Sequence, residues 1–92
     1  MRYLIEQRVR EPVKENEKLM WEINDARERA GKGFIARGIL KHRWHSVSDG
    51  ETTYQVIETD DPSILAEWAE AYRNVKKFKI SIIMTSEEYK GE

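Results

Sequence analysis

The sequence contains no cysteine, only two histidines and only two prolines among its 92 residues. Without cysteine the chain can form neither a disulfide framework nor a thiolate-based active site. Two histidines alone supply too few ligands for a dedicated zinc site. A haem site would need an axial histidine that faces a large apolar cavity, and neither histidine is expected to have such surroundings. We therefore expect no metal and no other cofactor.

Long hydrophobic runs are also absent. The longest unbroken runs have three residues, as in Ile82-Ile83-Met84, whereas a membrane-spanning helix needs about 20. Arg2 and Glu6 interrupt the N-terminal apolar run, so nothing there resembles a signal peptide. These absences predict a soluble, cytoplasmic protein with no membrane partner.

The chain has no excess of charge of one sign. It carries 16 basic and 17 acidic residues, which give a net charge of -1 although charged residues make up 36% of the sequence. Long-range attraction to nucleic acid needs a basic surface, so we expect no nucleic-acid partner. The clear periodicity of the apolar residues argues against disorder, and the length predicts a single domain over residues 1–92.

Residues 38–62 give the clearest prediction of secondary structure in the chain. Asp49-Gly50 lies between two β-prone segments, 38–45 and 51–59, and such a dipeptide is a strong hairpin signal. After the second segment, Asp61-Pro62 is typical of a helix start. This region therefore predicts a hairpin that leads directly into a helix.

The remaining segments alternate in type. Two further strands are predicted over residues 2–9 and 78–84, from apolar residues at every second position. Two helices are predicted over 13–30 and 62–75, from apolar stripes at helical spacing. The first stripe contains Leu19, Ile23, Ala26 and Ala30, and the second contains Trp68 and Tyr72, which we expect in the core. The order β-α-β-β-α-β predicts an α+β, ferredoxin-like fold, a four-stranded antiparallel sheet with two helices on one face.

Two helices cover only one face of such a sheet, so the other face is open. Alternation places one side of the first strand (Tyr3, Ile5 and Val9) and one side of the last strand (Phe78, Ile80, Ile82 and Met84) toward the helices. The open face would then hold four apolar residues among four charged or titratable ones: Leu4, Ile39, Ile57, Ile83, Glu6, Arg8, Arg43 and His45. This mixture is typical of an interface, and it predicts a homodimer formed through the open face. A single bulge near Lys41 or Ser46 would exchange His45 for Trp44 on that face.

The candidate site follows from this assignment. His45 is the candidate general base, Glu6 its carboxylate neighbour, and Arg43 a group that could hold an anionic oxygen. Trp44, His42 and Arg8 are the candidate ligand-binding residues, and the expected ligand is a small aromatic or carbonyl compound. The alternative is structural: Glu6 pairs with an arginine across the dimer and His45 bonds a backbone group.

Three segments resemble a known family of short proteins: Arg43-Trp44-His45, Glu58-Thr59-Asp60-Asp61-Pro62 and Leu65-Ala66-Glu67-Trp68. The family is uncharacterised and belongs to the dimeric α+β barrel superfamily. The resemblance covers nearly the whole chain and is best from Gly38 to Val75. It implies a ferredoxin-like protomer whose sheet packs on a second sheet to close a barrel. Better known superfamily members include cofactor-free and haem-degrading monooxygenases, muconolactone isomerases and chlorite dismutases, but no shared motif transfers their functional residues.

Two functions are therefore expected. The first is a homodimeric small-molecule-binding protein or a minor cofactor-free enzyme of monooxygenase or isomerase type, with its cavity between sheet and helices or inside the dimer barrel. The second is a structural or interaction module with no small-molecule ligand, in which side chains of the partner fill the open face. A cavity would favour the first, and its absence the second.

Overall fold

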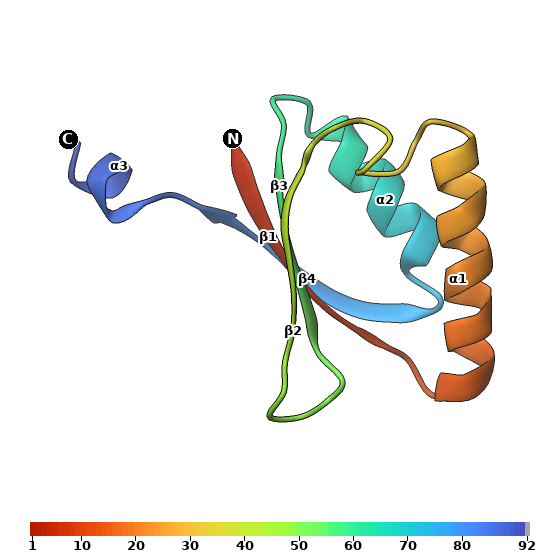
Figure 1. Ribbon diagram of the computed structural model, residues 1–92. Helices are drawn as coiled ribbons and strands as arrows, with labels where there is room; N and C mark the ends of the chain where they lie inside the picture. Colours follow the sequence, from red (N-terminus) through yellow and green to blue (C-terminus); the bar gives the residue numbers. More distant parts are fainter. Residues whose placement is uncertain (92) are drawn as a thin grey trace.

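A computed structural model describes residues 1–91 and places two helices on one face of a four-stranded antiparallel sheet (Figure 1). The strands are β1 (Arg2–Val9), β2 (Leu40–His45), β3 (Thr53–Glu58) and β4 (Lys76–Ile83). The helices are α1 (Val13–Arg29), α2 (Ser63–Tyr72) and α3 (Ser86–Lys90). The strand order is β2-β3-β1-β4, so the predicted ferredoxin-like β-α-β-β-α-β fold is confirmed.

The predicted hairpin is present as β2 and β3. Asp49 Oδ1 accepts hydrogen bonds from the backbone N–H groups of Glu51 at 2.9 Å and Thr52 at 3.0 Å. Gly50 follows with a φ of 66°, a left-handed conformation that glycine adopts without steric cost. The Asp-Gly dipeptide thus closes the connection between the strands by its own side-chain and backbone chemistry.

The core lies between the sheet and α2. Tyr3 and Ile5 of β1 face the helices, together with Phe78 and Ile80 of β4, as the alternation predicts. Trp68 and Tyr72 of α2 are both buried, which confirms their predicted place in the core. The other buried apolar members of this cluster are Phe34, Ile57, Ile64, Leu65 and Val75.

The predicted faces of β2 and β3 are wrong. Ile57 pairs with Tyr3 and is fully buried on the helix side, although the sequence assigned it to the open face. An irregularity between Leu40 and His42 shifts the register of β2, so that Arg43 lies opposite Gln55. Arg43 and His45 therefore face the helices, and Trp44 takes the open face, as a bulge near Lys41 would require.

α1 packs only loosely on the core. None of its residues is buried, and Leu19 is 46% exposed although it belongs to the predicted apolar stripe. Ala26 and Ala30 are exposed as well, so this part of the prediction is wrong. Met20 and Ile23 are the α1 side chains that pack against the core. The helix thus forms a wall beside the sheet with space behind it.

The boundary between α2 and β4 also differs from the prediction. The predicted helix ran to residue 75 and the last strand began at residue 78, but α2 ends at Tyr72 and β4 begins at Lys76. After β4 the chain forms the short helix α3, which is capped by Thr85, whose side chain accepts a hydrogen bond from Glu88 N at 3.1 Å. Residue 92 lies outside the described residues.

The helices of residues 1–91 are too short or too polar to cross a membrane. Figure 1 shows that α3 projects from the end of β4, away from the sheet and from the other two helices.

Candidate functional site

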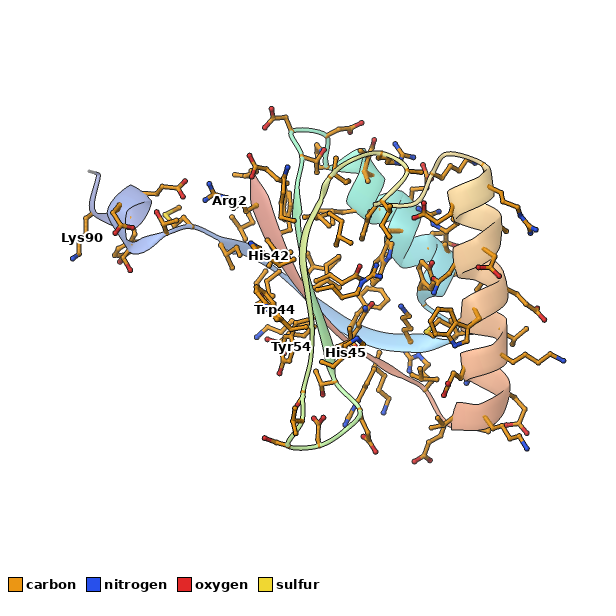
Figure 2. All side chains as sticks on the ribbon, viewed as in Figure 1. Arg2, His42, Trp44, His45, Tyr54 and Lys90 are labelled. Carbon is orange, nitrogen blue, oxygen red and sulfur yellow. The ribbon has the colours of Figure 1, made fainter. Side chains whose placement is uncertain are left out.

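A cavity of about 380 Å³ lies between α1 and the helix-facing side of the sheet. Its walls come from five parts of the chain: the inner face of the sheet, α1, α2, the loop that contains Phe34, and the end of the hairpin. The cavity exists because α1 contributes no buried side chain to the space beside the sheet, whereas α2 contributes four. Figure 2 shows His45 on this side of the sheet, pointing toward α1.

One wall of the cavity is aromatic. Trp68 stacks on Phe34 with ring centroids 6.0 Å apart, and it meets Tyr72 at 5.1 Å. Trp21 and Met20 add apolar surface from α1. Planar apolar surfaces of this kind pack well against a flat ring.

The sheet side of the cavity is polar. Gln7, Gln55 and Lys76 are the buried polar residues among residues 1–91, and all three line the cavity. The Lys76 ammonium donates a hydrogen bond to Gln7 Oε1 at 3.0 Å, and Nη2 of Arg43 donates one to Gln55 Oε1 at 3.0 Å. Each amide oxygen is thus held by a cation of a neighbouring strand.

The Lys76 ammonium lies among aromatic rings. Its Nζ atom is 4.5 Å from the centroid of the Tyr72 ring and 5.6 Å from that of Trp68. Burial lowers the pKa of Lys76 from 10.5 to about 8, and the positive charge of Arg43 acts in the same direction. Burial also raises the pKa of the Tyr72 hydroxyl, which donates a hydrogen bond to Asn24 Oδ1 of α1.

Two carboxylates of the helical layer, those of Glu28 and Glu67, are held by other groups. Glu28 accepts hydrogen bonds from the backbone N–H groups of Ile35 at 3.3 Å and Ala36 at 3.0 Å. Glu67 lies 3.4 Å from Arg27 Nη1 and 3.3 Å from Arg37 Nη2. Within the described residues, no carboxylate oxygen lies within 4.0 Å of the Lys76 ammonium or the Arg43 guanidinium.

The structure brings together only part of the predicted catalytic group. Arg43 and His45 both line the cavity, where His45 Nδ1 lies 3.3 Å from the Thr53 hydroxyl. Glu6 is on the opposite face of the sheet, between Tyr54 of β3 and Lys79 of β4. The expected grouping of Glu6 with His45 and Arg43 is therefore wrong, because the sheet separates them.

The predicted ligand-binding residues lie elsewhere. His42 and Trp44 stack on the open face with ring centroids 5.0 Å apart, and Trp44 lies opposite Tyr54 in the sheet (Figure 2). Arg8 borders the open end of the cavity, where its Nη1 is 3.8 Å from Glu51. His42 and Trp44 thus do not touch the cavity.

Lys76, Gln7 and Gln55 were not among the predicted site residues. Their positions carried a usable signal, because Lys76 has the same parity as Phe78 and Ile80, and Gln7 the same parity as Tyr3 and Ile5. Gln7 lies between Ile5 and Val9 in the predicted inner set, and Lys76 lies one step before Phe78, so the alternation already implied that both polar residues face the helices.

A search of curated proteins finds no match for this chain. A family model, in contrast, matches residues 1–91, which is almost the whole chain. The chain therefore belongs to the family described as Domain of unknown function (DUF3303).

Proposed function

We propose that this protein binds a small molecule in the cavity between α1 and the sheet. The observation that carries the proposal is the cavity itself, which at about 380 Å³ is within the range of natural ligand pockets. It also has their usual composition, an apolar aromatic wall with a few convergent polar groups. The aromatic wall favours a planar ligand, in line with the small aromatic or carbonyl compound expected from the sequence.

Catalysis is the more specific form of this hypothesis. A cofactor-free oxidation or isomerisation would use His45 as the base and Arg43 to hold an anionic oxygen. Glu6 cannot orient the His45 ring from the opposite face, and the neighbour of that ring is the Thr53 hydroxyl instead. The geometry thus supports binding better than it supports proton transfer.

The alternative, an interaction module without a small ligand, requires a filled interior. Side chains of α1 would then pack directly on the sheet, as those of α2 do. The absence of any buried residue in α1 and the size of the cavity support the ligand-binding hypothesis instead.

Filling the cavity should abolish binding. Thr53→Trp places a large ring on the inner face of β3, beside His45, where it occupies the space of a ligand. With the dye 8-anilinonaphthalene-1-sulfonate as the probe, we expect affinity to fall at least about tenfold, as measured by dye fluorescence in a titration.

The matched control is Ser48→Trp, which adds the same side chain in the exposed turn of the hairpin. It should leave dye affinity within about twofold of the wild type. Equal affinities of all three proteins for the dye would show that the cavity is not the binding site, and would overturn the proposal.

We further propose that a second copy of the chain covers the open face of the sheet. Trp44 is 51% exposed there, stacked on His42 and next to Tyr54, so an aromatic surface stands uncovered in the protomer. The face carries both signs of charge, since Glu6 lies opposite Lys79 across β1 and β4. Such a surface can pair with itself about a two-fold axis, which is the commonest arrangement of homo-oligomers.

Trp44→Glu should dissociate this dimer. A buried tryptophan is a typical interface hot spot, and a carboxylate at its place would be desolvated without a partner. We expect the dimer Kd to rise more than about tenfold, as measured by analytical ultracentrifugation over a concentration series.

Val47→Glu provides the control. Val47 is 97% exposed in the hairpin turn, so this substitution adds the same negative charge away from the open face of the sheet. A wild-type protein that sediments as a monomer at micromolar concentration would contradict the dimer proposal. This result would not bear on the proposal that the cavity binds a small molecule.

A further inference from the structure

We propose that the ligand is an aromatic carboxylate, whose anionic group binds to the Lys76 ammonium and the Arg43 guanidinium while its ring packs on the Trp68 wall. This inference rests on the proposed function, because it identifies the class of molecule that the cavity takes. Four observations carry it.

The first is a buried cation without a counterion. Lys76 is only 6% exposed, and buried charges in proteins are normally paired. Its hydrogen-bond partner is the neutral amide of Gln7, and the carboxylates of Glu28 and Glu67 are held by other groups. A bound anion would supply the missing negative charge.

The second observation concerns the orientation of the two buried amides. Ammonium and guanidinium groups can only donate, so the Gln7 and Gln55 groups that meet them at 3.0 Å must be the amide oxygens. The Nε2 groups of both residues make no hydrogen bond within the described part of the chain. The polar side of the cavity therefore offers four donor groups: one ammonium, one guanidinium and two amide NH2 groups.

The third observation is the arrangement of these donors across the sheet. Lys76 comes from β4, Gln7 from β1, Gln55 from β3 and Arg43 from β2, and all four line the same cavity. A carboxylate has two oxygens with about four acceptor sites, and a charge-assisted hydrogen bond is about twice as strong as a neutral one. The set matches a carboxylate better than a neutral carbonyl, which offers a single oxygen.

The fourth observation is the aromatic wall beside the ammonium. Trp68 and Phe34 stack next to Lys76, so a ligand that reaches the cation must place an apolar body on these rings. A small inorganic anion would leave this apolar surface uncovered. The arrangement thus favours an anion attached to a ring.

The charges around Lys76 come from several elements. Arg43 lies on β2, Tyr72 on α2, and Arg27 and Glu28 of α1 lie near the Tyr72 hydroxyl. Glu17, Asp25, His45 and Glu51 also line the cavity, and Arg10 donates a hydrogen bond to the Lys76 backbone carbonyl at 3.1 Å. Because the pKa of the ammonium is lowered to about 8, anion binding should weaken above that pH.

The test compares 2-naphthoate with its neutral isostere 2-naphthamide by isothermal titration calorimetry. In the wild type at about pH 7, we expect the carboxylate to bind at least about tenfold more tightly. In Lys76→Gln this preference should fall to less than about threefold. In Lys77→Gln it should stay as in the wild type, because Lys77 is an exposed lysine on the opposite face of the same strand.

A second measurement needs no variant. In the wild type, the preference for naphthoate should fall at least about threefold between pH 7 and pH 9.5 as Lys76 loses its proton. This pH dependence tests the inference if the Lys76→Gln variant does not fold.

Two results would overturn this inference but leave the proposed ligand binding in place. Equal binding of naphthoate and naphthamide to the wild type would show that the cavity accepts a ring without recognising its charge. A preference unchanged in Lys76→Gln and at pH 9.5 would place the anion elsewhere. If neither compound binds and the dye does not bind either, the proposed function falls together with the inference.

Discussion

Trp68→Ala should lower the free energy of unfolding by about 3–5 kcal/mol. Trp68 is 3% exposed and touches three other aromatic rings, those of Phe34, Tyr72 and Phe78. Its removal leaves a cavity at the point where α2 meets the sheet, next to the space that already exists beneath α1. A loss of this size is a large part of the total stability of a small domain, which is about 5–15 kcal/mol.

The measurement is urea denaturation followed by circular dichroism at one fixed protein concentration. Trp21→Ala is the matched control, because Trp21 is 57% exposed on α1 and should cost less than about 1 kcal/mol. Similar losses in the two variants would show that α1 contributes to the core as much as α2 does, against the packing described above.

The second large effect concerns Lys76 and the pH dependence of stability. The difference between the ordinary pKa of 10.5 and about 8 in the folded protein corresponds to about 3 kcal/mol. Below pH 8 the lysine is protonated in both states, and the folded state carries the full cost of burying the charge. Between about pH 8 and 10.5 the folded state has released the proton and the unfolded state still holds it, so stability rises with pH.

Lys76→Met removes this dependence. Between pH 7.5 and pH 10, we expect the unfolding free energy of the wild type to rise by about 2–3 kcal/mol relative to that of the methionine variant. The methionine variant keeps the other charged groups around this position, so the comparison isolates the effect of the Lys76 ammonium.

Urea denaturation at a series of pH values measures this difference. Lys79→Met serves as the control, because Lys79 is exposed on the other face of β4 and its replacement should not alter the pH profile. A profile that is the same for Lys76→Met and the wild type would mean that the Lys76 ammonium is hydrated in solution.

Alternation predicted the faces of two strands and failed for the other two. β1 and β4 carry apolar residues at every second position, such as Tyr3 and Ile5, so their inner faces could be read directly. β2 contains mainly charged and aromatic residues, and its register shift between Leu40 and His42 has no signature in composition. Arg43 and His45 were therefore assigned to the wrong face.

The polar part of the cavity was hidden for a related reason. Hydrophobic periodicity finds buried apolar residues, and it reads a lysine such as Lys76 as a helix terminus or a surface residue. Gln7 and Gln55 are buried because cations of neighbouring strands satisfy their oxygens, and such pairs link positions 69 and 12 residues apart in sequence. Without the strand order, no local pattern connects them.

α1 was predicted at nearly the correct residues, but of its predicted apolar stripe only Ile23 packs against the core, because the helix is rotated so that Met20 faces the sheet instead of Leu19. The spacing of Leu19 and Ala26 indicates an apolar stripe, whereas the side toward the sheet contains Met20, Asn24 and Arg27. This side is polar because it faces a cavity, and a helix that lines a cavity does not need a continuous apolar stripe.

Because α1 packs only loosely on the core, the molecule contains two groups of residues with different tolerance for substitution. Ile5, Ile57 and Trp68 hold the sheet and α2 together, so changes there cost folding free energy. The α1 residues that face the sheet shape the cavity without contributing a single buried side chain. The specificity of the protein can therefore be altered, by mutation or by design, through one helix wall while the rest of the scaffold stays intact.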